Sequence, residues 1–489
     1  MASRLYRALA VICAMAFLGA PAAAQIDPRS VWAELAHDDL EAIRDLLAEN
    51  HPGPVDPENS RYGEWLREGY AESSRRAEAA DSMADYERAL RHFANGFRDG
   101  HIALGLAYQP RAYTWPRFLV RRSLDGSSDT VFHSRIDAVP EGAELQSCDG
   151  QTVDALLAER VDPYHFNADI PHTRGRNVPR LFTLDPGDED RQFAQCVFLV
   201  DGEARAIDLE WRRLSARTRA ELFDLIRSDR PELGLRESGS TIFVGLPSFV
   251  QTGSGARAMQ ALIDELAARR DELRGRTVVF DVRGNGGGNS AWGVAVARAL
   301  WGEEWVNRIA ASFDNTVDWR VSESNIAHLN SVVETVRNDG LADAVAYWSE
   351  RRDIMLAAHE RGEALVRVPE PGVEPSGPPP ANPITGRVYF LTDSRCGSAC
   401  LDFADLMRRL PGVMHIGLPT YADAIYIDNS VAALPSGLAR FSYSLKVYRN
   451  RVRGNNEFYT PEIRWPGGPM TDEAITAWIG ELASRARSN

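Results

Sequence analysis

Two apolar segments that lie far apart in the chain each end in a turn of small residues, and this pair constrains the fold most strongly. The first segment, 278–282, runs into Gly284 to Gly288, and the second, 388–392, runs into a turn that contains Ser398. Both read as buried strands that end at a turn. Consecutive glycines at a strand end leave backbone N–H groups uncovered, which is what a developing oxyanion requires. Ser398 is therefore the candidate nucleophile.

The first 24 residues have the pattern of a secretory signal peptide. Arg4 and Arg7 precede an apolar run from Ala8 to about Ala20, and three alanines stand before Gln25. The apolar run is too short to span a bilayer. We therefore expect an exported protein, periplasmic or extracellular, that lacks residues 1–24 and has no stable membrane span.

The charge of the chain narrows the class of partner. The 489 residues carry a formal net charge of −14. Removal of the leader lowers the basic residues from 55 to 53 against 69 acidic ones, so the formal charge becomes −16. Such an acidic chain argues against nucleic acid and anionic membranes as partners.

Four cysteines remain after the leader, in a compartment that permits disulfides. They allow three pairings, of which we favour Cys148 with Cys196 and Cys396 with Cys400. The second pair is four residues apart, close to the geometric limit for a bridge within one helical turn. A metal site there is disfavoured because no histidine or further cysteine stands nearby at ligand spacing.

The length and the apolar patterning predict several domains. Residues 25–110 have the apolar spacing of a helical bundle, as at Leu40, Ile43 and Leu47, and 111–216 read as a β-rich module. Alternating strands and helices over 217–300 and 384–489 predict an α/β core with a largely parallel sheet. The intervening 301–383 read as a helical insertion followed by a proline-rich linker.

A serine nucleophile needs a base, and the chain offers two kinds. Its single lysine, Lys446, lies in an alternating strand pattern on the same face as Ser442 and Ser444, which predicts a solvated surface position. An ordinary lysine pKa makes a poor base without burial. His101 is the better candidate because it stands at a turn from a helix into a strand, although a lone histidine there is also typical of a structural residue.

Several motifs, in this order along the chain, resemble the tail-specific or carboxy-terminal processing serine peptidases, which include the tricorn core protease. They are the His51-Pro52-Gly53-Pro54 turn, Asp99-Gly100-His101, Asp281-Val282-Arg283-Gly284-Asn285-Gly286-Gly287, Ser398-Ala399 and Gly417-Leu418-Pro419-Thr420. The resemblance to this family, peptidase family S41, implies a crotonase/ClpP-like catalytic core. It also implies that the 111–216 module is PDZ-like and receives a peptide strand.

The identity of the catalytic base distinguishes two branches of this family. The processing branch has a lysine about twenty-five residues after its serine, and this chain has Asp423 there. The tricorn-like branch uses the histidine of the Asp-Gly-His element and a downstream glutamate, to which Glu457 is similar. The resemblance thus implies Ser398 as nucleophile, His101 as general base and Glu457 as the group that orients the imidazole.

The oxyanion donors would be the N–H of Ala399 and one from the glycine turn, most simply Gly287, with Gly286 beside it. Asn285 and Arg283 are expected to support that turn. The chain departs from the family at Leu401, where an acid often stands, with Asp402 one place later.

The predicted function is an exported serine peptidase that hydrolyses peptides or unfolded protein segments by acyl transfer and needs no metal or cofactor. Two alternatives stay open: a non-catalytic protein of the same fold that binds an apolar ligand in its cleft, and an esterase-like hydrolase that uses the same residues. The joint presence of Ser398, His101 and Glu457 favours an enzyme over a binding protein.

Overall fold

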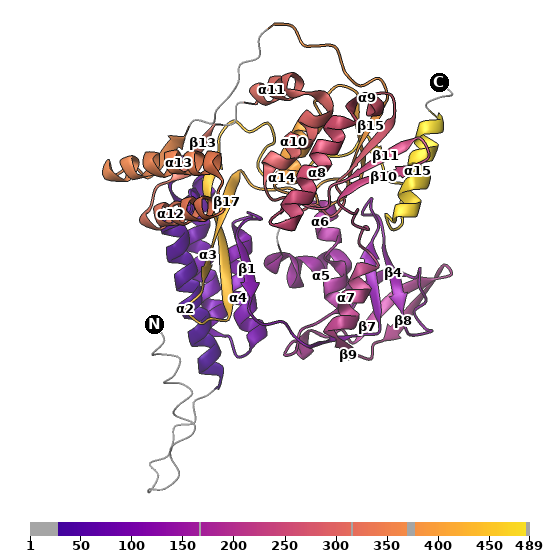
Figure 1. Cartoon of the computed structure of the whole chain (residues 1–489). Coiled ribbons are helices and arrows are strands. Elements are labelled where there is room, and N and C mark those ends of the chain that lie inside the picture. The colour runs from indigo at the N-terminus through magenta and orange to yellow at the C-terminus, as the bar shows by residue number, and fades with distance from the viewer. Residues whose placement is uncertain (1–27, 166–167, 314–315, 369–376, 486–489) are drawn as a thin grey trace.

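The computed structural model describes residues 28–165, 168–313, 316–368 and 377–485 (Figure 1). The predicted signal peptide and the first part of the proline-rich segment lie outside these residues. The described chain is a mixed helix and sheet structure, as the sequence predicted. N-terminal helices stand on one side, the β-rich module lies beside them, and the α/β core lies above the module (Figure 1).

The N-terminal segment forms the predicted helices α2 (Pro28–Asn50), α3 (Ser60–Glu78) and α4 (Met83–Gly96). Leu40, Ile43 and Leu47 of α2 are fully buried, because a spacing of three and four residues places them on one helix face. They share a hydrophobic core with a five-stranded sheet rather than with helices alone.

That sheet has the order β1-β18-β13-β14, with β17 also paired to β18. Its strands are β1 (Ala103–Leu106), β13 (Val317–Arg320), β14 (Leu365–Val368), β17 (Tyr426–Ala433) and β18 (Ala439–Tyr448). Segments from three distant parts of the chain therefore build one sheet against the N-terminal helices.

The structure corrects the predicted helical insertion at 301–383. This segment contains helices α11 (Glu303–Ala311), α12 (Glu323–Asn338) and α13 (Ala342–Glu360), but it also contributes strands β13 and β14. β13 pairs with β18, so the segment completes the first sheet. Each of the two strands has only four residues, which is too short for a clear local pattern in the sequence. Such strands become evident only from their pairing with a distant strand.

The module over 111–216 is β-rich, as predicted. Its main sheet joins β3 (Phe118–Arg122), β4 (Asp129–Ser134), β5 (Glu144–Cys148), β7 (Gln195–Val200) and β8 (Glu203–Asp208), with β6 (Gln151–Thr152) on β5 and a separate pair of β2 (Ala112–Trp115) and β9 (Arg212–Ser215). Helices α5 (Val153–Arg160) and α6 (Pro171–Gly175) connect β6 to β7. Cys148 and Cys196 lie opposite each other on β5 and β7 and form the predicted disulfide.

The α/β core is built on a six-stranded sheet of order β10-β11-β12-β15-β16-β19. Its strands are β10 (Gly234–Ser238), β11 (Thr241–Gly245), β12 (Thr277–Asp281), β15 (Arg387–Thr392), β16 (Val413–Gly417) and β19 (Ile463–Arg464), and all neighbours except β10 and β11 are parallel. Helices α8 (Ser254–Ala268), α9 (Arg270–Leu273), α10 (Ser290–Trp301) and α14 (Ala399–Met407) accompany one core cluster, and α15 (Asp472–Arg485) belongs to the other. Strands buried on both faces explain the continuous apolar runs in the sequence.

This topology brings the two turns of the sequence together. β12 and β15 are adjacent and parallel, with Asp281 opposite Leu391. The glycine turn after β12 and the serine turn after β15 therefore leave the sheet at the same edge, which is where α/β sheets place their ligands.

Lys446 is not the solvated surface lysine that the strand pattern predicted. Its residue is only 7 % exposed, and its Nζ lies 2.7 Å from Asp428 Oδ2 and over the rings of Trp319 and Tyr448. Ser444 on the same strand is fully buried. The reason is that β18 is an inner strand paired with β1, β13 and β17, so its polar side chains are also enclosed.

Candidate active site

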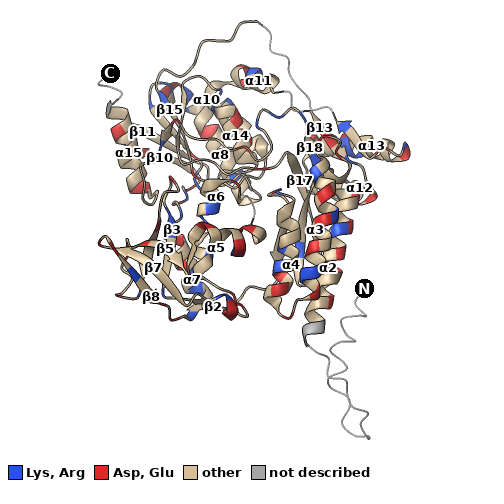
Figure 2. Ribbon diagram, turned by 180° about the vertical axis from the view of Figure 1, so that it is seen from behind, with Lys and Arg blue, Asp and Glu red and all other residues tan. Residues whose placement is uncertain are grey.

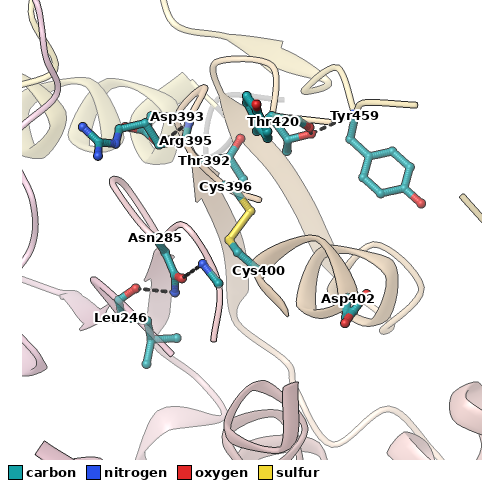
Figure 3. Close-up of a disulfide and its surroundings, with 12 residues drawn as sticks. Leu246, Asn285, Thr392, Asp393, Arg395, Cys396, Cys400, Asp402, Thr420 and Tyr459 are labelled. Carbon is teal, nitrogen blue, oxygen red and sulfur yellow. Dashed lines mark hydrogen bonds between the residues drawn. A yellow bond between two sulfur atoms is a disulfide. The ribbon is translucent and has the colours of Figure 1, made fainter. Parts of the chain in front are cut away.

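The serine turn and the glycine turn are joined by direct hydrogen bonds. Asp393 Oδ1 accepts the N–H of Gly284 at 3.0 Å, and the carbonyl of Asn285 accepts the N–H of Gly397 at 3.3 Å. Asn285 is fully buried and donates through Nδ2 to the carbonyl of Leu246 (Figure 3). Arg283, also fully buried, is held by Asp281 and Asp472. Both side chains support the turn, as expected.

Ser398 occupies a strained backbone conformation directly before α14. Its φ is 52° and its ψ is −127°, a region that non-glycine residues rarely adopt. The residue is half-buried, and its hydroxyl has no hydrogen-bond partner among the described residues. A serine held at a sharp strand-to-helix turn with a free hydroxyl has the placement of a nucleophile.

Gly287 lies against this serine. A Cβ at Gly287 would stand 2.7 Å from the Cβ of Ser398 and 2.9 Å from the N of Ala399, and its φ of 103° disfavours any side chain. The glycine turn therefore lies so close to the first amide of α14 that no side chain fits between them.

The structure differs from the prediction at one of the expected oxyanion donors, the N–H of Gly287. The N–H of Gly287 donates to Asn285 Oδ1 at 2.9 Å. The side chain of Asn285 therefore supports the turn and also occupies this N–H group. Within the described chain, the N–H groups of Ala399, Gly286 and Gly288 have no hydrogen-bond acceptor. Ala399 begins a helix, where the first N–H groups lack intrahelical partners.

We expect Gly287→Ala to lower kcat by at least two orders of magnitude. The added methyl group would displace Ser398 and Ala399 from their positions beside the glycine turn. Loss of an oxyanion donor typically lowers the rate by about 10² to 10³. Steady-state hydrolysis of a fluorogenic peptide measures this. Gly275→Ala, at an exposed glycine whose added Cβ meets open space, is the matched control. Near-parental turnover by Gly287→Ala would contradict the placement.

Cys396 and Cys400 form the second predicted disulfide, which spans the nucleophile turn (Figure 3). Cys396 precedes Ser398 and Cys400 lies in the first turn of α14, so the bridge ties the loop to the helix that Ser398 begins. Both cysteines are fully buried. The bridge therefore restrains the turn from its interior side.

His101 stands at the predicted turn between α4 and β1. Asp99 Oδ1 accepts the backbone N–H of His101 at 2.8 Å, which closes a tight turn around Gly100. The same oxygen lies 3.5 Å from the imidazole Nδ1, an ion-pair distance without a directed hydrogen bond. With Nδ1 facing a carboxylate, Nε2 is the nitrogen available to a substrate or a nucleophile.

A second histidine lies on the other side of Asp99. His51 Nδ1 accepts the N–H of Gly53 at 2.9 Å, so a neutral His51 carries its proton on Nε2, which lies 3.4 Å from Asp99 Oδ2. Burial lowers the pKa of His51 and would raise that of Asp99, but the two imidazoles hold the pKa of Asp99 well below its usual range. The His51 turn thus positions Asp99 toward His101.

Asp423, at the position of the lysine in the processing branch, belongs to a buried ion-pair network. Its Oδ1 lies 3.2 Å from Arg451 and 3.2 Å from Arg453. Arg453 also pairs with Asp405 and with Asp402, the acid that is displaced by one residue in the sequence. Asp423 also lies near His101, where its negative charge raises the pKa of the imidazole.

The pKa of His101 is raised above its ordinary value. Burial alone would lower it, but Asp99 and then Asp423 stabilise the imidazolium more than Arg451 destabilises it. A general base must be neutral, so activity should fall as the pH drops through this raised pKa.

We expect Asp423→Asn to move the acid limb of the pH dependence of kcat/KM to lower pH, since it removes one carboxylate that raises the pKa of His101. A pH series with a fluorogenic peptide measures the limb. Asp428→Asn, which removes an acid that is paired with Lys446, is the control. A limb that stays in place or moves to higher pH would contradict this role for Asp423.

Glu457 does not contact His101 in this structure. The side chain is exposed, and its Oε2 accepts the N–H of Gly454 at 2.6 Å. The neighbouring Asn456 donates through Nδ2 to the carbonyl of Arg98 at 2.7 Å, which anchors the Glu457 loop to the turn that holds His101. The loop thus lies beside His101, and the carboxylate that faces the imidazole is Asp99.

The role of Asp99 is the point that the sequence interpretation missed. Its position two residues before His101 was the available signal, because a side chain at that spacing in a tight turn returns to the residue it precedes. Ser394, four residues before Ser398, accepts a hydrogen bond from Arg176 through its hydroxyl and its carbonyl.

The described residues contain no group of three or more side chains suited to hold a metal ion. The same residues include no helix that is both long enough and apolar enough to cross a membrane.

Residues 241–453 match the model of peptidase family S41. The matched range contains the glycine turn, Ser398 and Asp423. Over this range the chain is a member of peptidase family S41. It is a serine-type peptidase by this membership, and the turn geometry of Ser398 agrees with that class.

Two solved structures show the same fold over most of the chain. Mature CPAF has a TM-score of 0.58 at 14 % identity and covers 89 % of this chain and 93 % of its own. Mature CPAF complexed with lactacystin has a TM-score of 0.58 at 15 % identity and covers 89 % and 94 %. At this identity the likeness shows the fold. A search of curated proteins finds no match.

Proposed function

We propose that this S41 peptidase hydrolyses peptides or unfolded protein segments through Ser398, with His101 as general base and acid. The observation that carries the proposal is the strained Ser398, whose free hydroxyl and following N–H lie against the glycine turn. An imidazole with its Nδ1 toward a carboxylate supplies the second part of the same chemistry.

In the proposed reaction, Ser398 Oγ attacks the carbonyl carbon of the peptide bond while His101 Nε2 takes the hydroxyl proton. The resulting oxyanion accepts hydrogen bonds from the N–H of Ala399 and from the Gly286 to Gly288 turn. Collapse breaks the C–N bond, and the departing amine takes the proton from His101. Water then enters by the same route and releases the acyl group from Ser398.

We assign the orientation of the imidazole to two carboxylates. Asp99 holds Nδ1 in the present arrangement, and Glu457 is the group that would join it when substrate draws the 454–458 loop inward. The bond from Asn456 to Arg98 supports this, since it keeps Glu457 next to the turn of the base. Catalytic hydrogen bonds are often long in unliganded enzymes and shorten in the complex.

A fluorophosphonate probe tests the nucleophile. We expect covalent labelling of the parent enzyme, loss of labelling in Ser398→Ala, and full labelling in the matched control Ser394→Ala. Mass spectrometry of the labelled peptide identifies the serine. Labelling that survives Ser398→Ala would place the nucleophile elsewhere. No labelling of a folded parent enzyme would favour the binding protein.

Peptidase and esterase activity are separated by substrate. An enzyme that requires the amide leaving group to be protonated by His101 should cleave unfolded protein and peptides as well as activated esters. Digestion of a denatured protein mixture, with mass spectrometry of the new termini, measures this. Ester turnover without any new peptide termini would support the esterase.

We further propose that the protein is exported. The pattern of residues 1–24 and two disulfides in the folded chain support this, because disulfides persist in oxidising compartments. Cell fractionation and N-terminal sequencing test it, with Gln25 as the expected first residue. An unprocessed chain in the cytosolic fraction would contradict it.

A further inference from the structure

The β-rich module and α4 line a cavity that contains neither Ser398 nor His101. It has a volume of about 200 Å³, several times the roughly 30 Å³ that one water molecule occupies in the liquid. Its wall comes from α4, the 3₁₀ helices η2 (Asp162–Tyr164) and η3 (Val178–Phe182) and the helix α7 (Ala216–Asp224). Basic segments are visible on α4 and α7 in Figure 2.

The lining of this cavity is strongly basic, although the chain as a whole is acidic. Six arginines face three carboxylates, Glu87, Asp185 and Asp188, which leaves a formal excess of three positive charges. The arginines are Arg88, Arg91, Arg160, Arg180, Arg191 and Arg219. A recessed pocket with one sign of charge concentrates ions of the other sign.

Two of the carboxylates are already used by arginines of α4. Arg88 pairs with Asp188, and Arg91 pairs with Glu87. The third, Asp185, forms no ion pair or hydrogen bond with Arg180 or Arg219. Arg160 pairs with Glu159, and Arg191 lies 3.9 Å from Asp188. Among the described residues, Arg180 and Arg219 are thus the two lining arginines without an ion-pair partner.

Arg180 and Arg219 have unused donors in the described structure. Arg180 donates through Nε to Asn177 Oδ1 at 3.1 Å, and its two Nη groups have no partner. The guanidinium of Arg219 lies over the rings of Tyr113 and Phe223, and its buried Nε has no acceptor. Both are half-buried, and Arg219 and Arg91 contribute, after burial, to lowering the pKa of Arg180 to about 10.

We propose that this cavity is a binding site for a phosphate group. Two guanidinium groups on different elements present more N–H donors than the two oxygens of one planar carboxylate can accept. A tetrahedral phosphate has more oxygens, which point in different directions, so it can accept from both guanidinium groups. Bound phosphate would supply the negative partner that Arg180 and Arg219 lack, and it would link η3 to α7.

Calorimetric titration of the full exported chain with inorganic phosphate, at constant ionic strength, tests the site. We expect saturable binding of one phosphate, weakened about tenfold or more in both Arg180→Gln and Arg219→Gln, as for the loss of a charge-assisted hydrogen bond. Arg217→Gln is the matched control on α7, because Arg217 is 90 % exposed and pairs with Glu221. It should bind phosphate as the parent does.

Circular dichroism and peptide hydrolysis confirm that each variant is folded, and the two independent variants guard against failure of one. Absence of saturable phosphate binding, or equal weakening by Arg217→Gln, overturns the site. Co-sedimentation with phosphatidylglycerol vesicles distinguishes the source: loss of this binding in Arg180→Gln assigns a lipid headgroup, whereas phosphate binding without co-sedimentation assigns a soluble ligand. Because Ser398 takes no part, failure of the site leaves the proposed peptidase function untouched.

Discussion

His101→Ala is expected to lower kcat for peptide hydrolysis by a factor on the order of 10⁴ to 10⁶, comparable to removal of the base in other serine hydrolases. The physical reason is that Ser398 would keep its strained turn and its free hydroxyl but would lose the imidazole that we propose takes its proton. Stopped assays with a fluorogenic peptide at saturating substrate measure kcat.

Two control variants make this result specific. His133→Ala removes a histidine of the β-rich module and should leave kcat unchanged. Lys446→Arg should also leave the rate nearly unchanged, because the lysine is held by Asp428 within the first sheet. A drop of several orders of magnitude in Lys446→Arg, with activity retained in His101→Ala, would restore a serine–lysine dyad.

The variants Asp99→Asn and Glu457→Gln should show how much each carboxylate contributes to the orientation of the His101 imidazole. Replacing the orienting carboxylate of a serine triad by its amide lowers kcat by about 10⁴, because the wrong tautomer is favoured. We expect a loss of this size in Glu457→Gln if the loop closes on substrate. Asp99→Asn should lower kcat and also shift the acid limb to lower pH, since Asp99 raises the pKa of His101.

The same kinetic data separate the two roles. Glu462→Gln changes another acid of the C-terminal segment, which accepts the N–H of His415, and is the control. Near-parental kcat in Glu457→Gln together with a large loss in Asp99→Asn would make Asp99 the orienting group. The reverse pattern would make Asp99 a structural carboxylate between His51 and His101.

The local patterns of the sequence predicted those elements whose signal is long and uniform. The α2 spacing of Leu40, Ile43 and Leu47 predicted a packed helix, and the apolar runs 278–282 and 388–392 predicted inner strands of a parallel sheet. The Cys396–Cys400 disulfide also followed from its spacing of four residues. These features depend on neighbours within the same segment, so the amino acids report them directly.

Contacts between distant segments were less accessible. β13 and β14 are four-residue strands that exist because β18 pairs with β13, and Lys446 is buried because the same sheet encloses it. At the site, Asn285 occupies the N–H of Gly287, and Asp99 rather than Glu457 lies nearest to the imidazole. Both of these last contacts join residues two positions apart, so their local spacing was a signal that the sequence interpretation did not use.

The amino-acid sequence by itself determined the class of fold, the serine turn and the glycine turn, because each is a strand that ends in residues chosen for their backbone freedom. Only the tertiary structure decided that Gly287 lies against Ser398 and that Asp423 and the Glu457 loop lie beside the turn of His101. The reason is that hydrogen-bond partners and burial are set by segments that meet only after the parallel sheet has formed.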